Sequence, residues 1–213
     1  MKHREYSHKH GADIVRSNPE LESLYQEIIL IIDSISDDEI QTRFNAQKGA
    51  SKSISKVLNS MMKESFVNHG WNPESKIFHG DKYSAWRLDF SKPAKSGNRD
   101  VGIAVEVAFN HSGSVAWNLI KPVLASEMNH VEKETNIGNG IGVLICATDD
   151  CRVKGGFDNA IGTYEGIIDY LIPLERILST PLIVIGLEAP ESFIVKHTKV
   201  GNRNVGSLVP TNP

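Results

Sequence analysis

Helical periodicity dominates the first third of the chain. Asn18-Pro19-Glu20 is typical of a helix start, because Asn caps free N–H groups, Pro fits the first turn and Glu faces the positive end of the dipole. Apolar residues then recur at three- and four-residue spacing and predict a helix over 20–35. A second helix is predicted over 51–69, ending at Gly70, and the polar stretch 36–50 is predicted to be a loop.

Alternation of polar and apolar residues replaces the helical pattern in the middle of the chain. Strands predicted over 76–79 and 82–90 flank Gly80-Asp81, which suits a two-residue hairpin turn. The segment 101–109 is the clearest strand, with large apolar side chains on one face and mostly small ones on the other. Glu106 lies on the small face, so its carboxylate has space around it.

Helices and buried strands alternate in the last part of the chain. The further predicted elements are a helix over 114–132, a strand over 141–147, a helix over 160–178 and a strand over 182–187. The tail over 190–213 is rich in Pro, Gly and Asn and is expected to be at most partly ordered. Together these elements predict a single domain over 1–213, of the α/β or α+β class, built on a mixed sheet.

Composition and charge narrow the class of protein further. The chain has 213 residues, 40% of them hydrophobic and 23% charged, which is ordinary for a globular protein. A net charge of −3 does not by itself indicate a nucleic-acid partner, so local basic clusters must be considered instead. Cys146 and Cys151 fit neither a disulfide framework nor a zinc motif, and no signal peptide or membrane span is evident. We therefore expect a cytoplasmic protein without a membrane partner.

Two acidic residues stand in strand-like runs that a hairpin would bring together. If the strands pair across the loop 91–100, Asp89 and Glu106 converge, and Mg²⁺ accepts one or two carboxylates together with water and phosphate oxygens. A structural alternative is a carboxylate pair tied to Lys or Arg at a sheet edge, and residue spacing alone favours it. Asp100 competes with Asp89, because a shorter hairpin would place Asp100 nearer to Glu106.

The two acidic segments resemble the BglII/BstYI-type family of type II restriction endonucleases, a branch of the PD-(D/E)XK nucleases. Family members carry Asp-Phe-x-Lys, a short turn and a strand with Glu-Val, and this chain has Asp89-Phe90-Ser91-Lys92 and Glu106-Val107. Further similar segments, which extend the resemblance over most of the chain, are Tyr6-Ser7-His8, Glu27-Ile28-Ile29, Trp71, Glu74-Ser75 and 182–186.

The resemblance implies a restriction-endonuclease-like mixed sheet flanked by helices, with Mg²⁺ bound at the sheet edge. Asp89, Glu106 and the Val107 carbonyl would be its ligands, and Glu74 would be a third catalytic acid. The implied activity is Mg²⁺-dependent hydrolysis of double-stranded DNA by metal-activated water. A homodimer would act on a short palindromic site, for which a GATC core is one option, and a cognate DNA methyltransferase is expected in the same system.

Two features depart from the family pattern. The loop between the two motif halves is longer than in family members, and Ala108 stands where they have Gln or Glu. Because a methyl group cannot orient or deprotonate water, one alternative is a catalytically weakened or inactive relative that binds DNA without cutting it. The other alternative is an unrelated α/β domain whose acidic residues are structural.

Basic and polar residues near the acids are the candidates for DNA contact. Lys92, Lys95 and Arg99 crowd the predicted loop, and each phosphate contact would release counterions. Asn110 and His111, at the end of the central strand, are further candidates for contact with DNA. The lysines of the second predicted helix are interpreted as a solvated face, and they are Lys52, Lys56 and Lys63.

Overall fold

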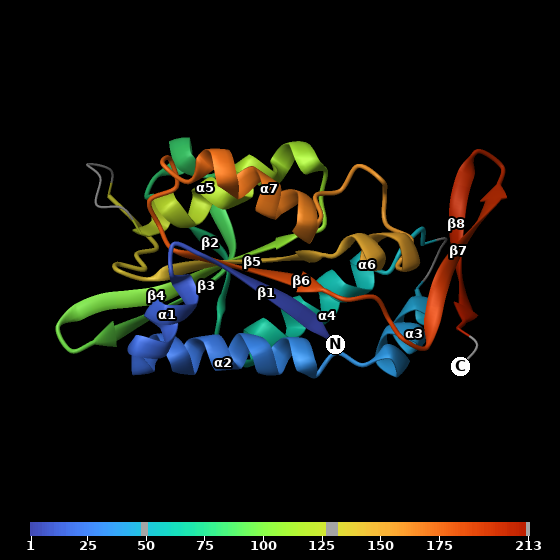
Figure 1. Ribbon diagram of the computed structural model, residues 1–213, viewed down its shortest axis with the longest axis horizontal. Coiled ribbons are helices and arrows are strands. Elements are labelled where there is room, and N and C mark those ends of the chain that lie inside the picture. Colours follow the sequence, from blue (N-terminus) through green and yellow to red (C-terminus); the bar gives the residue numbers. More distant parts are fainter. Residues whose placement is uncertain (48–50, 127–131, 212–213) are drawn as a thin grey trace.

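A mixed β-sheet forms the centre of the computed structural model, which describes residues 1–47, 51–126 and 132–211 (Figure 1). The strands of the protein are β1 (His3–His8), β2 (Asn72–Lys76), β3 (Arg87–Ser96), β4 (Arg99–Ala108), β5 (Ile141–Ala147), β6 (Leu182–Leu187), β7 (Phe193–Val200) and β8 (Arg203–Pro210). Its helices are α1 (Gly11–Ser17), α2 (Pro19–Asp33), α3 (Asp37–Ala46), α4 (Ser55–Asn68), α5 (Val115–Ser126), α6 (Asp149–Lys154) and α7 (Tyr164–Leu174). Short 3-10 turns cover Asp81–Tyr83 and Ser112–Ser114.

Sheet pairing explains the composition of the strands. Within the described residues six strands form one sheet in the order β1-β6-β5-β4-β3-β2, and β7 pairs with β8 apart from it. β4, β5 and β6 run parallel, whereas β1, β3 and β2 are joined antiparallel. β5 and β6 are buried along their whole length, as central parallel strands usually are, and both have the bounds predicted from sequence. The expected mixed sheet flanked by helices is confirmed.

Helices cover both faces of the sheet (Figure 1). α2 and α4 pack on one face, where their apolar side chains form a core cluster with the large side chains of β3 to β6. α5 and α7 cover the other face, where a second cluster includes Ala108 and Leu144. The predicted start of α2 is confirmed, since the Asn18 side chain accepts hydrogen bonds from the N–H groups of Glu20 and Leu21.

The stretch 36–50, predicted to be a loop, contains helix α3. Ser36 caps this helix by accepting a hydrogen bond from a backbone N–H of the first turn. Ile40 and Phe44 lie one turn apart and are both buried, so two apolar residues in a polar sequence are enough to dock the helix. Residues 48–50 of the predicted loop lie outside the described part of the chain.

Gly80-Asp81 is not the two-residue turn of a hairpin. β2 and β3 do pair antiparallel, but residues 77–86 connect them and include a short 3-10 turn. Within the connection, the ring of Phe78 lies 5.4 Å from that of Tyr83 and 6.2 Å from that of Trp86, measured between centroids. Aromatic packing therefore stabilises a longer connection in place of the tight turn.

The predicted loop 91–100 is the far end of the β3–β4 hairpin. β3 continues to Ser96 and β4 begins at Arg99, so Gly97-Asn98 is the turn, and Gly97 has the positive φ of 61° that glycine tolerates. The hairpin extends beyond the helices (Figure 1), and most side chains near its tip are exposed. Because polar residues can occupy both faces of such a strand, the sequence lacks the alternation that marks a half-buried one.

The tail also differs from the expectation of partial order, because residues 193–210 form the β7–β8 hairpin. Phe193 and Val195 are buried and join the core cluster of the α2 face, while the following residues of β7 are exposed. The two buried side chains anchor the hairpin to the core. The other residues of β7 lack the alternation of apolar and polar side chains that would predict a strand from the sequence. Residues 212–213 lie outside the described part of the chain.

The helix predicted over 160–178 is shorter than expected, because α7 ends at Leu174. The helix predicted over 114–132 corresponds to α5, which is described up to Ser126, and residues 127–131 lie outside the described residues. β1, α1 and α6 are short or mostly polar, and the sequence pattern does not predict them. Where the structure describes the chain, no helix is long and apolar enough to cross a membrane.

Candidate active site

The central sheet opens between β3 and β4. Their ladder ends at the pair Phe90–Val105, although β3 continues beside β2 and β4 continues beside β5. We call the opening between residues 87–89 and 106–108 the fork. Strand separation at this point exposes backbone groups and side chains that a continuous ladder would cover, so the fork is a natural place for a site.

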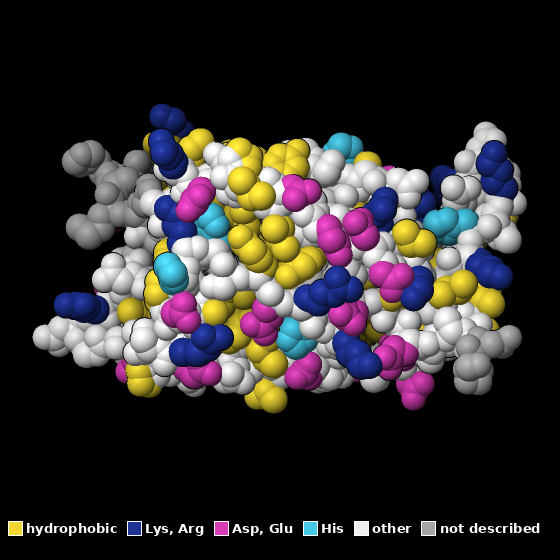
Figure 2. Space-filling model, in the orientation of Figure 1, with side chains coloured by type: hydrophobic (Ala, Val, Ile, Leu, Met, Phe, Trp, Pro, Cys, Tyr) yellow, Lys and Arg dark blue, Asp and Glu magenta, His cyan; other side chains and the backbone are white. Residues whose placement is uncertain are grey.

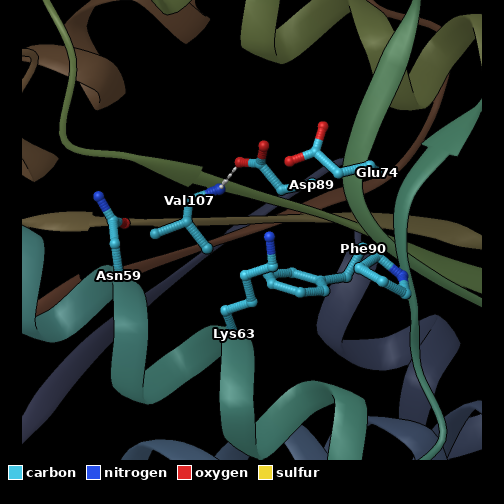
Figure 3. Close-up of a pocket in the computed structure, with 7 residues that line it drawn as sticks. Asn59, Lys63, Glu74, Asp89, Phe90 and Val107 are labelled. Carbon is cyan, nitrogen blue, oxygen red and sulfur yellow. Dashed lines mark hydrogen bonds between the residues drawn. The ribbon is translucent and has the colours of Figure 1, made fainter.

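Asp89 bridges the fork with its side chain. Its Oδ2 atom accepts a hydrogen bond of 2.7 Å from the Val107 N–H on the opposite strand (Figure 3). Burial raises the pKa of Asp89, and the nearby Glu74 carboxylate raises it further, while the Val107 N–H and the Lys121 ammonium oppose the rise. The hydrogen bond fixes the direction of the carboxylate, because it replaces a cross-strand ladder bond.

Glu106 is almost fully buried, with 1% of its surface exposed. Its Oε2 atom contacts the ammonium of Lys121, which comes from α5. Its Oε1 atom is also buried, and among the described residues it has no hydrogen-bond partner. Burial raises the pKa of Glu106 to about 8, the Asp89 carboxylate adds to the rise, and the Lys121 ammonium and the Asp89 backbone N–H oppose it. The Oε2 atom therefore has a cationic partner, whereas the Oε1 atom is buried without a hydrogen-bond partner among the described residues.

Glu74 brings a third carboxylate to the same level of the sheet. In the β2–β3 ladder, the position of Glu74 lies opposite that of Asp89. If the β3–β4 ladder is extended by one pair beyond Phe90–Val105, Asp89 lies opposite Glu106. Glu74 itself interrupts the β2–β3 pairing, because its φ of 48° lies in the left-handed region that non-glycine residues rarely adopt. Figure 3 shows the Glu74 and Asp89 carboxylates side by side above the strand.

A pocket of about 240 Å³ lies in front of Glu74 and Asp89, whereas Glu106 is buried behind it and does not line it. Its lining residues are Asn59, Lys63, Pro73, Glu74, Asp89, Phe90 and Val107. Asn59 and Lys63 come from adjacent turns of α4 and face the pocket from the side opposite the two carboxylates (Figure 3). The pocket therefore has an acidic wall from the sheet and a wall with an ammonium and an amide from the helix.

The donor set at the fork fits a divalent cation. Within the described residues no group of three or more His, Cys, Asp and Glu side chains is placed so that it could hold a metal ion by itself. Mg²⁺ does not need such a group, because it keeps several waters and takes one or two carboxylates together with phosphate oxygens. The buried Glu106 Oε1 has no hydrogen-bond partner among the described residues, and burial raises the pKa of Asp89 and Glu106, so a cation at the fork would stabilise the ionised form of both carboxylates.

The structural interpretation of the acids is met only in part. It requires Asp89 and Glu106 to pair with Lys or Arg, and Glu106 does contact Lys121. Asp89 instead binds a backbone N–H and lines the pocket. Asp100 is ruled out as the partner of Glu106 by its place on β4, six residues away or roughly 20 Å at strand spacing. Asp100 lies opposite Lys95, 3.6 Å from its ammonium.

The basic residues predicted to lie beside the acids are elsewhere. Lys92 points toward α2, where its ammonium contacts both oxygens of Glu27, at 2.7 and 3.0 Å, and the His69 carbonyl at 2.8 Å. Lys95 and Arg99 lie near the exposed tip of the β3–β4 hairpin. The extended hairpin accounts for this difference. A loop over 91–100 would have kept Lys95 and Arg99 beside the fork, whereas the two extended strands carry them to the far end of the hairpin.

Asn110 and His111 have local structural contacts. Asn110 Oδ1 accepts a hydrogen bond of 3.3 Å from the Asn118 side chain, which ties the end of β4 to α5. His111 Nδ1 accepts from the Gly113 N–H at 3.1 Å and caps the short turn before α5. Neither residue lines the pocket in front of the acids.

Two lysines at the site were not identified as functional from the sequence. Lys63 was interpreted as part of a solvated helix face, and its position one turn after Asn59 gives no signal by itself. Lys121 lies in a helix whose buried residues are mostly apolar, and it is buried as well. The position of Lys121 among the apolar residues of this helix is the signal that could have identified it, because a buried ammonium group is rare unless it has a partner.

Comparisons with known proteins define the class and then the family. The fold is that of a restriction endonuclease: a crystal structure of BglII complexed with a DNA 16-mer matches with a TM-score of 0.64 and 17% identity, covering 99% of this chain and 100% of that chain. Free BglII matches with a TM-score of 0.50 and 14% identity over the same shares. Curated proteins give no match.

The family model described as restriction endonuclease BglII/BglIII matches residues 3–187. The chain therefore belongs to this family of DNA-cleaving enzymes, as its resemblance to BglII/BstYI-type enzymes led us to expect. The matched span includes β1 to β6 and all three acids at the fork, while β7 and β8 lie beyond it.

Proposed function

We propose that this protein is a Mg²⁺-dependent type II restriction endonuclease that cuts double-stranded DNA at a short palindromic site. The observation that carries the proposal is the meeting of Asp89 and Glu106 at the fork, with one buried carboxylate oxygen left without a partner among the described residues. The family membership supplies the DNA-cleaving chemistry to which this arrangement is fitted.

Asp89, Glu106 and the Val107 carbonyl would hold the ion. The Val107 N–H points toward Asp89, and the carbonyl of a strand residue points to the same side as its N–H, so that oxygen also faces the fork. Glu74 lies beside Asp89 and would act as a further acid. A bound divalent ion would supply Lewis-acid stabilisation of the phosphodiester and lower the pKa of a water molecule.

The reaction itself is a simple hydrolysis. Water forms a bond to phosphorus, the bond from phosphorus to one sugar oxygen breaks, and that oxygen receives a proton. Lys63 and Asn59 face the acids across the pocket, where an ammonium and an amide can contact a backbone phosphate held between the two walls. The helix α4 therefore supplies the phosphate contact that the sequence assigned to residues near the hairpin tip.

More distant basic groups would contribute to DNA binding. Lys95 and Arg99 are exposed on the extended hairpin and are retained as candidate contacts. Lys92, Asn110 and His111 have internal partners, and we do not include their side chains in the proposed DNA surface. The β7–β8 hairpin projects at the end of the molecule (Figure 1), and its exposed basic residues are Lys196, Lys199 and Arg203.

A homodimer would match a two-fold symmetric site. Large exposed apolar side chains on the face covered by α5 and α7 are Trp117, Tyr170, Ile172 and Ile177. Figure 2 shows hydrophobic side chains gathered over the region where α7 lies. Covering them in a subunit interface would remove apolar surface from water. A GATC core in the site, a cytoplasmic location and a cognate DNA methyltransferase complete the proposal.

Plasmid cleavage in Mg²⁺ tests the proposal. We expect the wild type to linearise plasmid DNA at defined sites and Glu106→Ala to leave it intact. Asp89→Asn is expected to be inactive but folded, because the amide oxygen can still accept from Val107 N–H. Asp100→Asn, a matched change at the hairpin tip, is expected to retain cleavage.

The second candidate function is DNA binding without cleavage, and Ala108 is the observation that favours it. A wild-type protein that retards DNA in gels but never nicks it in Mg²⁺ or Mn²⁺ would establish this candidate and refute the enzyme.

A further inference from the structure

Position 108 cannot supply the polar group that family members have two residues after the strand glutamate. Ala108 is 1% exposed and belongs to the apolar cluster with Val115 and Leu119 of α5. The space beside it is filled by this helix, so neither its own side chain nor a water held by it can serve the site. A group that orients the attacking water must come from another element.

The helix that fills this space also brings a charged group to the site. Lys121 lies on α5, is 8% exposed, and its ammonium contacts Glu106 Oε2. Glu106 and Ala108 are two residues apart on β4 and share the face that α5 covers. One turn before Lys121, the Asn118 side chain donates to Asn110 Oδ1 and fixes α5 against the end of β4. The ammonium therefore approaches the site from the side that residue 108 would occupy.

A purely structural ion pair does not explain this arrangement well. Taking an ammonium and a carboxylate out of water costs several kcal/mol each unless both are fully satisfied. Here Glu106 Oε1 is buried and has no hydrogen-bond partner among the described residues. The carboxylates of Glu74, Asp89 and Glu106 exceed the ammonium groups of Lys63 and Lys121 by one charge, so a divalent ion at the fork would reverse the sign of the site and make it attractive to phosphate.

We propose that Lys121 replaces, from helix α5, the polar group that is missing at position 108. Its ammonium lies beside Glu106 and donates a hydrogen bond to the water that attacks the phosphodiester. An ammonium has three donors, and the contact with Glu106 uses one of them. This inference rests on the proposed nuclease function and explains how a chain with Ala108 can still cleave DNA.

The test separates catalysis from folding and metal binding. Lys121→Met keeps the length of the side chain and removes its charge and donors. We expect single-turnover DNA cleavage in Mg²⁺ to fall by about 100-fold or more, as when one preorganised donor is removed. Mn²⁺ affinity, measured by calorimetry, and DNA affinity in Ca²⁺, measured by fluorescence anisotropy, are expected to change by less than about 5-fold, because Asp89, Glu106 and the DNA contacts remain.

Control variants make each outcome decisive. Lys2→Met removes an exposed lysine that also pairs with a glutamate, and it is expected to cleave like the wild type. Lys121→Arg keeps the charge and is expected to cleave faster than Lys121→Met. If Lys121→Met does not fold by circular dichroism, Lys121→Gln takes its place under the same criteria.

Three results would overturn the inference. The first is cleavage by Lys121→Met at a rate close to that of the wild type. The second is a parallel loss of Mn²⁺ affinity, which would reduce Lys121 to a support for Glu106. The third is a Lys121→Arg variant no faster than Lys121→Met. Failure of the proposed function would look different, because the wild type itself would then neither cleave DNA nor bind Mn²⁺ in a Glu106-dependent manner.

Discussion

At the scale of single residues, Glu106 shows how a folded chain can hold a charge that its own structure does not fully compensate. A carboxyl in water would ionise near pH 4.5, but burial raises the pKa of Glu106 to about 8. Below the pKa of the unfolded chain this carboxyl is protonated in both the folded and the unfolded state, and its contribution to the free energy of unfolding is then fully present. This contribution is lost as the pH rises through the folded value, because ionisation is then easier in the unfolded chain.

The stability of the metal-free protein should therefore fall with pH in a way that depends on Glu106. Between about pH 5 and about pH 9, the wild type should lose about 1 kcal/mol or more relative to Glu106→Gln, roughly 2–4 °C in Tm for a chain of this size. Thermal unfolding in the presence of a chelator measures both curves. Glu191→Gln, at an exposed ion pair, is the matched control and should follow the wild type. Parallel curves for wild type and Glu106→Gln would contradict the prediction.

At this scale the sequence and the family resemblance together indicated all three acids, Glu74, Asp89 and Glu106, but not Lys121. Asp89 and Glu106 were predicted to meet, and the structure brings them to opposite sides of the fork. The choice of Asp89 over Asp100 depended on the family resemblance, because spacing alone cannot tell where a hairpin turns. Lys121 follows Asp89 by 32 positions, and its contact with Glu106 depends on how α5 crosses the sheet. Local pattern contains no information on that crossing.

At the scale of elements, α4 makes both the core and one wall of the pocket. Its apolar residues pack under the sheet, while Asn59 and Lys63 face the acids. A helix with this double role keeps its ammonium at a fixed distance from the fork, since the packed face prevents rotation. Lys63 is therefore well placed to neutralise one phosphate of bound DNA.

Replacement of Lys63 by Met should weaken DNA binding and change its salt dependence. We expect the slope of the logarithm of the binding constant against the logarithm of salt concentration to decrease by about 1, because one phosphate contact is lost. Fluorescence anisotropy titrations in Ca²⁺ at several salt concentrations measure the slope. Lys56→Met changes an exposed lysine of the same helix that lies outside the pocket, and it should leave the slope unchanged. Equal slopes for Lys63→Met and the wild type would refute the contact.

Elements were predictable where burial imposes a strong pattern. β5, β6 and the apolar face of α2 are buried along their length, and their positions followed from the sequence. α3, the tip of the β3–β4 hairpin and β7–β8 bury few side chains each, so their sequences resemble loops. In these elements capping, ladder hydrogen bonds and one or two anchors fix the structure, and such interactions leave little trace in hydrophobic periodicity.

At the scale of the whole molecule, the two faces of the sheet differ in what they expose. The α5–α7 face presents Trp117, Tyr170 and Ile172, whereas the opposite face presents Leu30 of α2 and Val67 of α4. The α5–α7 face, which also exposes aromatic side chains, is the better candidate for a subunit interface, because scattered exposed aliphatic residues are common on monomers.

A charge on the α5–α7 face should disrupt the proposed homodimer. Ile172 is 67% exposed, so Ile172→Glu should fold normally but place a carboxylate in the interface. We expect its dimer dissociation constant to rise by about 10-fold or more, as measured by sedimentation velocity or light scattering over a range of concentrations. Leu30→Glu, at a residue 62% exposed on the other side of the sheet, should dimerise like the wild type. Equal dissociation constants would place the interface elsewhere.

The fork also determines which changes of chain length the enzyme can tolerate. Asp89 and Glu106 lie directly beyond the last β3–β4 ladder pair, Phe90–Val105, so their relative position is set at this end of the ladder and not by the length of the hairpin at the other end. Adding one residue to each strand near Gly97-Asn98 lengthens the hairpin and leaves the acids in place. Adding one residue to a single strand inverts side-chain parity and turns one acid to the other face. Hairpins of different length can therefore carry the proposed site in the same arrangement, provided that insertions and deletions are paired.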